Sequence, residues 1–130
     1  MPKYFDIHSH VQFDAFDQDK EEVIQRALEN DTWMINVGTE IETSVKAIEL
    51  AEKYSEGVYA IVGLHPVHAA SEENFNYEEY KKLANHPKVL GIGECGLDYY
   101  RCDTESIEKQ KEIFIQQIKL ANEVNKPLML

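Results

Sequence analysis

The run Val58-Tyr59-Ala60-Ile61-Val62-Gly63-Leu64 is the stretch that decides the fold. It is apolar throughout and too short for a typical helix, so it predicts a strand that is buried on both faces. It also contains the longest apolar stretch of the chain, far short of the ~20 residues that cross a bilayer. We therefore expect no membrane span. Short apolar runs of the same kind predict four more strands, at Tyr4–Ile7, Trp33–Val37, Val89–Ile92 and Leu128–Leu130.

Longer polar segments with apolar residues at helical spacing lie between these runs. They predict four helices, around Val23–Leu28, Val45–Ala51, Tyr77–Leu83 and Phe114–Ala121. In the last of these, Phe114, Ile118 and Ala121 form the expected buried face. Asp19 with Glu22 and Asn76 with Glu79 have the spacing of a capping box, which predicts helix starts at both places.

Strands that alternate with helices are typical of a parallel sheet, so the predicted class is α/β. The 130 residues have room for one domain, residues 1–130. An open doubly wound sheet and a closed (β/α)8 barrel both fit this order, and such a barrel normally needs about 250 residues. Five strands and four helices make about half of one. The segment Lys126–Leu130 resembles a strand that has just begun, as if the chain stopped in the middle of the fold.

Composition narrows the possible functions. Hydrophobic residues make up 43% and charged residues 28% of the chain, as in ordinary globular proteins. The net charge of -11 disfavours broad non-specific binding to duplex DNA, although a small, locally neutralised site for a polyanion stays open. The first residues show no secretion signal, so we expect a cytoplasmic protein with its two cysteines reduced.

Two imidazoles close the first predicted strand, in Asp6-Ile7-His8-Ser9-His10. Side chains at i and i+2 of a strand point to one face, so His8 and His10 form a candidate site for a divalent metal. The alternative is that one or both are ordinary loop histidines.

Two further candidates, His65 and Glu94, also lie at the ends of predicted strands. The carboxyl ends of parallel strands carry the chemistry of barrel enzymes, so these side chains should converge with the histidine pair. Glu94 in a buried strand would need a cation beside it, whereas at a frayed strand end it would simply be solvated. His65 could contact substrate or could bond a loop carbonyl.

The loop after Glu94 carries Asp98, which could orient a ligand, and Arg101, which could grip a phosphate. An ordinary surface ion pair between them explains the same residues. Tyr99 and Tyr100 could stack on a base or pack at the rim. The remaining candidates are assigned no chemistry: His68 and His86 are expected to be solvated, and Cys95 is expected to face away from Glu94 and serve packing.

Four segments together strongly resemble the TatD family of metal-dependent hydrolases along the whole chain: Asp6-Ile7-His8-Ser9-His10, Asn36-Val37-Gly38-Thr39, Gly63-Leu64-His65-Pro66 and Gly93-Glu94-Cys95-Gly96-Leu97-Asp98-Tyr99-Tyr100. The resemblance implies a TIM-type barrel of the amidohydrolase kind and a centre of two divalent ions, Mg, Mn or Zn. It also implies exonucleolytic hydrolysis of the phosphodiester bonds of DNA.

The same resemblance assigns roles by matching positions. His8 and His10 would bind the first metal, and Glu94 would bridge to the second. His65 would lie beside the scissile phosphate, which makes Glu94 and His65 the implied catalytic residues. Asp98 and Arg101 would contact substrate with His65. Val11-Gln12 departs from the Leu-Asp pair that many relatives place after His-x-His.

Relatives of this family continue past Leu130 into two further histidines and an aspartate of the site. The chain therefore resembles the N-terminal half of the enzyme, for which we expect weak binding of the second metal and little activity alone. Its open sheet edge predicts self-association or pairing with a C-terminal half. Two alternatives stay open: an amidohydrolase-like enzyme acting on small phosphoesters or amides, and a non-catalytic remnant that binds a metal or a partner.

Overall fold

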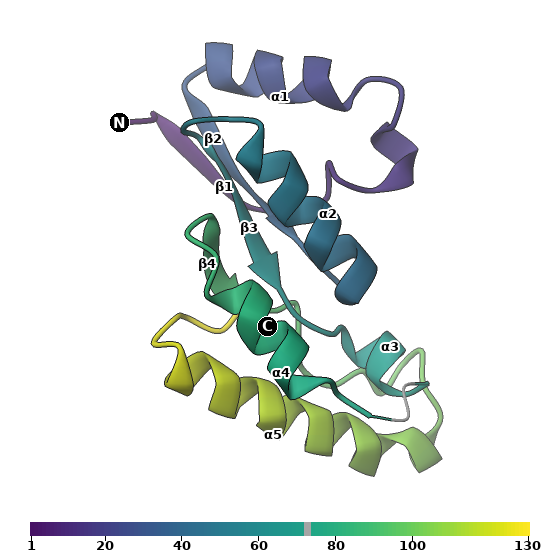
Figure 1. The fold of residues 1–130 in the computed structure, drawn as a ribbon. Coiled ribbons are helices and arrows are strands. Elements are labelled where there is room, and N and C mark those ends of the chain that lie inside the picture. Colours follow the sequence, from purple (N-terminus) through teal and green to yellow (C-terminus); the bar gives the residue numbers. More distant parts are fainter. Residues whose placement is uncertain (72–73) are drawn as a thin grey trace.

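The computed structural model describes residues 1–71 and 74–130. A parallel four-stranded sheet, with strand order β1-β2-β3-β4, forms its centre (Figure 1). The strands are β1 (Tyr4–Ser9), β2 (Thr32–Val37), β3 (Val58–Val62) and β4 (Val89–Ile92). The four runs that predict them are placed correctly, apart from the ends of the strands.

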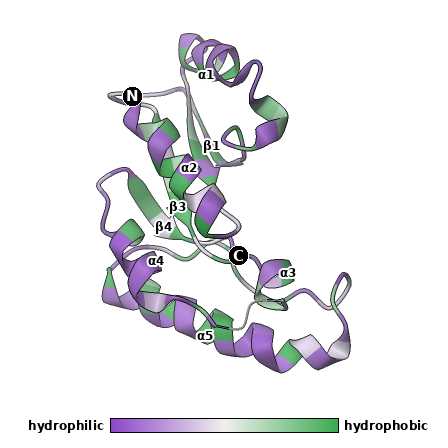
Figure 2. Ribbon diagram, turned by 45° about the vertical axis from the view of Figure 1, so that its right-hand side comes forward, coloured by the Kyte–Doolittle hydropathy of each residue, from purple (hydrophilic) through white to green (hydrophobic). Residues whose placement is uncertain are grey.

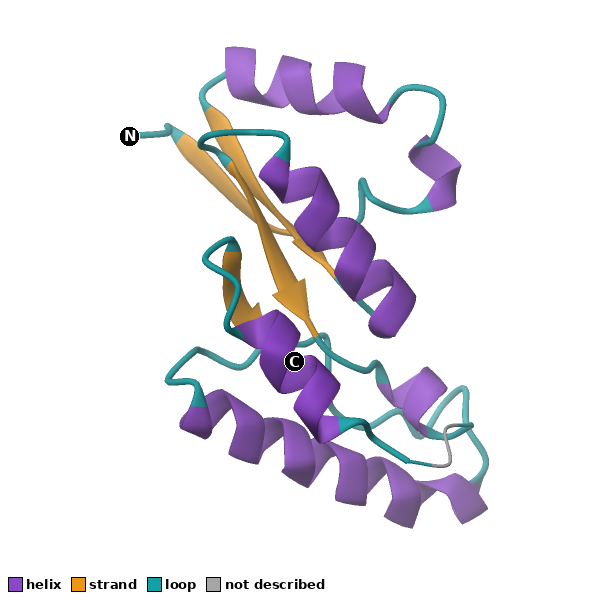
Figure 3. Cartoon of the chain, in the orientation of Figure 1, coloured by secondary structure: helices purple, strands orange, loops and turns teal. Residues whose placement is uncertain are grey.

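Helices follow each strand, as the predicted α/β class requires (Figure 3). They are α1 (Lys20–Glu29), α2 (Ile41–Glu52), α3 (Pro66–Ala69), α4 (Tyr77–Ala84) and α5 (Ile107–Glu123), with short 3-10 turns at Asp14–Phe16 and Thr104–Ser106. The four predicted helices are all present. The short helix α3, a single turn that Pro66 starts and His65 caps, was not predicted.

The predicted fifth strand at Leu128–Leu130 is wrong as a strand. Leu128 forms an isolated parallel bridge with Ile92, and the flanking hydrogen bonds involve the carbonyl oxygen of Pro127 and the amide of Met129. The reason is local: Leu128 pairs with Ile92, which is the last residue of β4, so the rest of the segment runs past the end of that strand.

One of the two predicted helix caps is correct. The Asn76 side chain accepts a hydrogen bond from the backbone N–H of Glu79 at 3.2 Å, and it donates to the Glu79 carboxylate at 2.9 Å. Asp19 precedes α1 but its side chain forms no capping hydrogen bond. The three-residue spacing therefore predicts the cap of α4 correctly and the cap of α1 wrongly.

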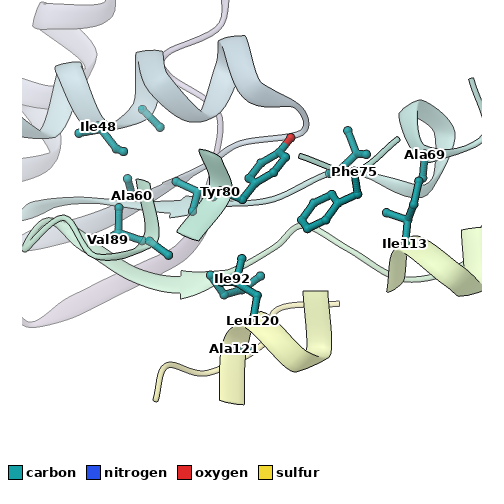
Figure 4. Packing of buried hydrophobic residues seen from close by; sticks show 14 residues of the cluster. Ile48, Ala60, Ala69, Phe75, Tyr80, Val89, Ile92, Ile113, Leu120 and Ala121 are labelled. Carbon is teal, nitrogen blue, oxygen red and sulfur yellow. The ribbon is translucent and has the colours of Figure 1, made fainter. Parts of the chain in front are cut away.

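The core lies mainly between the sheet and its helices. Figure 4 shows its largest cluster, in which the rings of Phe75 and Tyr80 stack at 4.7 Å and Ile92 of the sheet lies against Leu120 of α5. Apolar residues dominate the strands, whereas the outer surfaces of the helices are hydrophilic (Figure 2). A smaller cluster around Ile35 and its neighbours covers the opposite face of the sheet.

The buried face of α5 differs from the predicted one. Gln110, Ile113, Gln117, Leu120 and Ala121 are buried, whereas Ile118 is 36% exposed and Phe114 is half-buried. Gln117 explains the difference, because its Oε1 accepts from the N–H of Leu64 at 2.9 Å and its Nε2 donates to the Leu64 carbonyl at 3.0 Å. A buried amide whose hydrogen bonds are satisfied is tolerated in a core, and hydrophobic periodicity does not detect it.

Within residues 1–71 and 74–130, the helices are all too short or too polar to cross a membrane.

Replacing Gln117 with alanine would leave the N–H and C=O of Leu64 without these partners in a buried place. Each lost partner costs about 1–3 kcal/mol, so we expect the free energy of unfolding to fall by about 2–4 kcal/mol. Urea denaturation followed by circular dichroism measures it. The matched control is Gln116→Ala at the neighbouring, half-buried glutamine of the same helix, which should change stability by less than about 1 kcal/mol. An equal loss of stability in both variants would contradict a stabilising role for the hydrogen bonds between Gln117 and Leu64.

Candidate metal centre

The two outermost strands of the sheet bring their polar side chains together. His8 lies in β1 and His10 directly follows it, while Glu94 comes two residues after β4. His8 Nε2 lies 3.1 Å and His10 Nε2 lies 3.9 Å from the same oxygen, Glu94 Oε2. Two strands separate β1 from β4, so this contact requires a sheet that curves toward the site. The predicted convergence of strand ends is correct in position.

Glycines permit the close approach of backbones beneath the site. A Cβ on Gly63, just after β3, would lie 2.5 Å from the carbonyl oxygen of Gly93. A Cβ on Gly93 would lie 2.6 Å from the Met129 carbonyl oxygen, and the φ of +154° at Gly93 itself favours glycine. These two glycines let the backbone after β3 lie against Gly93, and the backbone at Gly93 lie against Met129, directly before Glu94.

His10 is oriented as a metal ligand. Its Nδ1 lies 2.7 Å from the carbonyl oxygen of Val37, and since a carbonyl only accepts, Nδ1 must carry the proton. In the neutral ring Nε2 then has a free lone pair, and it is the atom that faces Glu94. Ligating histidines use the same arrangement, in which the second nitrogen donates to a backbone carbonyl. Phe13 stacks on the ring at 4.6 Å and supports its orientation.

His65 is oriented for a different role. Its Nδ1 accepts a hydrogen bond from the backbone N–H of Val67 at 3.1 Å, so in the neutral ring the proton is on Nε2. That Nε2 lies 3.6 Å from Glu94 Oε1. Burial lowers the pKa of His65 below its ordinary value, which favours the neutral ring, although the nearby Glu94 carboxylate opposes the shift. His65 therefore offers a hydrogen-bond donor rather than a lone pair.

The donor set of His8, His10 and Glu94 fits a divalent ion. One nitrogen or oxygen from each lies within 4.8 Å of the others, and their side chains are 36%, 30% and 23% exposed. Two imidazoles and a carboxylate form a common three-ligand set that leaves further positions open. For a second ion the described residues offer less, because the remaining Glu94 oxygen faces the proton-bearing nitrogen of His65.

The Asp98 side chain holds its own loop together. Its Oδ1 accepts from the backbone N–H groups of Tyr100 and Arg101 at 2.9 and 2.8 Å, and its Oδ2 accepts from the Arg101 guanidinium at 2.9 Å. These bonds, first the one from the Arg101 backbone, lower the pKa of Asp98 below its usual value. From α5, Gln110 accepts from the Asp98 N–H and donates to its carbonyl. The ion pair between Asp98 and Arg101, which the sequence analysis kept as an alternative, is therefore present, and it lies within this turn.

A cavity of about 400 Å³ lies between this loop and Glu94. His65, Glu94, Asp98 and Arg101 all contribute to its wall, so the predicted substrate-contacting residues share one space. The Arg101 side chain is 65% exposed and keeps guanidinium donors free of the Asp98 bond. Both tyrosines of the loop are exposed, Tyr99 at 60% and Tyr100 at 95%.

The residues to which the sequence analysis gave no chemistry lie outside the cluster. His68 is 3.8 Å from Glu40, and His86 is 3.0 Å from Glu52, so each histidine faces a carboxylate in addition to solvent. Cys95 is buried and its thiol bonds the Met129 carbonyl, as expected for a packing role, and burial raises its pKa to about 12. Both cysteines are free thiols.

Two supporting residues were missed from the sequence. Gln110 and Gln117 clamp the loops that follow β4 and β3, and they lie seven residues apart on the same face of α5 as Ile113. That spacing is visible in the sequence. A polar residue repeated in register with a buried helix face would have indicated them.

A curved parallel sheet with helices on its convex side, and a histidine–carboxylate cluster at the carboxyl ends of its strands, define half of a β/α barrel of the metal-dependent hydrolase class. The chain belongs to the TatD family: the family model for TatD-related DNases matches residues 5–130.

Individual relatives agree with this assignment. The chain is 41% identical over 127 residues to the uncharacterized metal-dependent hydrolase YabD of Bacillus subtilis, covering 97% of this chain and 49% of YabD. It is 35% identical over 127 residues to the 3'-5' ssDNA/RNA exonuclease TatD of Cronobacter sakazakii, covering 97% and 48%. The crystal structure of YjjV, a TatD homologue from Escherichia coli, superposes with a TM-score of 0.84 at 31% identity, covering 96% and 49%. The chain thus spans about half the length of the relatives it matches.

If His10 ligates an ion through Nε2, His10→Ala should weaken binding of Mn²⁺ by about 10- to 100-fold or more, the loss known for groups that only support a ligand. Titration of the metal-free chain with Mn²⁺, followed by the electron spin resonance of the free ion, measures the affinity. His86→Ala provides the matched control, because His86 pairs with Glu52 outside the cluster. An unchanged affinity in His10→Ala would show that the cluster is not a metal site.

Proposed function

We propose that this chain supplies the metal-binding part of a divalent-metal-dependent phosphodiester hydrolase that trims DNA exonucleolytically. The observation that carries the proposal is that Glu94 belongs both to the cluster with His8 and His10 and to the wall of the cavity that His65 and Arg101 line. Relatives named ssDNA/RNA exonucleases support the nucleic-acid substrate.

His8, His10 and Glu94 would hold the first ion, with Mg²⁺, Mn²⁺ and Zn²⁺ as the candidates. Glu94 would also help to hold the other ion of a two-metal centre, which this chain alone would bind weakly. When bound, such ions lower the pKa of a water molecule and neutralise charge that develops on phosphate oxygens. In a protein with a net charge of -11, this local neutralisation is what admits a phosphodiester.

His65 and Arg101 would contact the substrate directly. The Nε2–H of His65 would donate to a non-bridging phosphate oxygen, because its tautomer places the proton on that atom. The Arg101 guanidinium would grip a phosphate through the donors that Asp98 leaves free. Asp98 would position Arg101, and it lines the same cavity, where it would face the substrate. The cavity wall keeps these groups next to Glu94.

Two other functions fit parts of the site. Hydrolysis of small phosphoesters or amides would use the same three ligands, and a non-catalytic metal-binding remnant would explain why the second ion has few ligands here. A cytoplasmic location stays a prediction from the sequence.

The direct test of the proposed function is cleavage of a 5'-labelled single-stranded oligonucleotide with Mg²⁺ or Mn²⁺. We expect slow shortening of the strand, stopped by EDTA and reduced by about 100-fold or more in Glu94→Gln. Glu112→Gln, at an exposed glutamate of α5, should leave the rate unchanged. Cleavage at an unchanged rate in Glu94→Gln would contradict the proposed function. Turnover of bis(4-nitrophenyl) phosphate without DNA cleavage would favour the small-phosphoester alternative, and turnover on neither would favour the remnant.

Self-association through the sheet is the second proposal for this chain. β1 is an outermost strand and is exposed along most of its length, with Phe5 43% and Ile7 58% exposed. Unpaired strand edges with apolar side chains pair readily with other chains. Light scattering coupled to size exclusion should therefore show a mass above 15 kDa that rises with concentration. Ile7→Lys should lower that mass, while Ile115→Lys on the exposed side of α5 should not. A monomer at all concentrations would contradict this proposal.

A further inference from the structure

The cavity beside the metal centre has two chemically different sides. His65, Glu94 and Arg101 give it a polar end, whereas Pro66, Leu97 and Phe114 give it an apolar wall. Its volume of about 400 Å³ lies within the range of 300–1,000 Å³ that is usual for small-molecule sites. The polar end is accounted for by the proposed phosphate chemistry, but the apolar wall is not.

Core packing does not account for the apolar wall either. α5 contributes Ile113, Leu120 and Ala121 to the main core cluster, whereas Phe114 is half-buried and lines the cavity. Leu97 is 39% exposed although it is a large apolar residue. Leaving such groups open to water is unfavourable unless something covers them.

The apolar wall is also fixed in place. Leu97 immediately precedes Asp98, whose backbone N–H and carbonyl are both bonded by Gln110. Phe114 comes one helical turn after Gln110 on the same helix, so one element positions both apolar residues. A wall held this firmly suits a flat, rigid ligand, because little ordering is needed when it binds.

We propose that Leu97 and Phe114 form a subsite for a nucleobase, with the phosphate of the same nucleotide at Arg101 and the Glu94 cluster. The proposal rests on the proposed function, since it places one nucleotide of the substrate. An aromatic ring beside an aliphatic wall binds any base through its faces, so this subsite accepts all four bases. Removing one such aromatic typically weakens base binding by roughly 5- to 100-fold.

The test uses binding without turnover, by isothermal titration calorimetry of the 130-residue chain with Mg²⁺ present. The probes are thymidine 5'-monophosphate, which an exonuclease would release, and deoxyribose 5-phosphate, which lacks the base. We expect the nucleotide to bind at least 5-fold more tightly. Phe114→Ala should abolish this preference while leaving affinity for deoxyribose 5-phosphate unchanged.

Ile115→Ala is the matched control, because Ile115 is the next residue of α5 and is 51% exposed. It should retain the full preference. Circular dichroism checks that Phe114→Ala folds, and Leu97→Ala, which alters a loop instead of the helix, should reduce the preference independently. Equal binding of the two probes, absence of binding by both, or an equal loss in Ile115→Ala would overturn the subsite. These outcomes are distinct from failure of the proposed function, which is decided by DNA cleavage in Glu94→Gln.

Discussion

The curvature of the sheet is the constraint on which the site depends. β1 and β4 are its outermost strands, and adjacent strands lie about 4.8 Å apart, so three spacings separate their backbones along the sheet. His8 and Glu94 nevertheless lie 3.1 Å apart, which is possible only because their side chains meet across the concave side. A change that flattened the sheet would separate the ligands without altering either residue.

Buried amides connect this curved sheet to the loops of the site. α5 reaches the β3 loop through Gln117, which bonds Leu64 next to His65, and the β4 loop through Gln110, which bonds Asp98. One helix thus positions the side of the cavity that would contact substrate. The metal side depends instead on β1 and its contact with β2, where Val37 orients His10. The two halves of the site are supported by different parts of the chain.

Most of the fold, and the placement of the candidate site residues at one edge of the sheet, could be predicted because both follow from local patterns. Apolar runs identify the strands, and a histidine or glutamate at the end of a parallel strand must lie at one edge of the sheet. The fifth strand and the Asp19 cap were predicted wrongly. The pairing of Leu128 depends on where β4 ends, which the sequence does not show, and Asp19 forms no capping bond although its partner would be local. The same limit explains α5: its buried face includes Gln117, whose partners belong to a loop 53 residues away in sequence.

The division of labour between His10 and His65 shows what the structure adds to a motif. Both are histidines at strand ends and both face Glu94, so residue type and spacing do not separate their roles. The tautomer of each neutral ring is set by one backbone group: Nδ1 of His10 donates to the carbonyl of Val37, and Nδ1 of His65 accepts from the N–H of Val67. Toward Glu94 the neutral His10 ring therefore presents a lone pair, suited to a cation, and the neutral His65 ring presents a proton, suited to a phosphate oxygen. The sequence left open whether His65 bonds a loop carbonyl or contacts substrate. Its loop partner is an N–H, and that bond is what leaves the Nε2 proton available to a substrate.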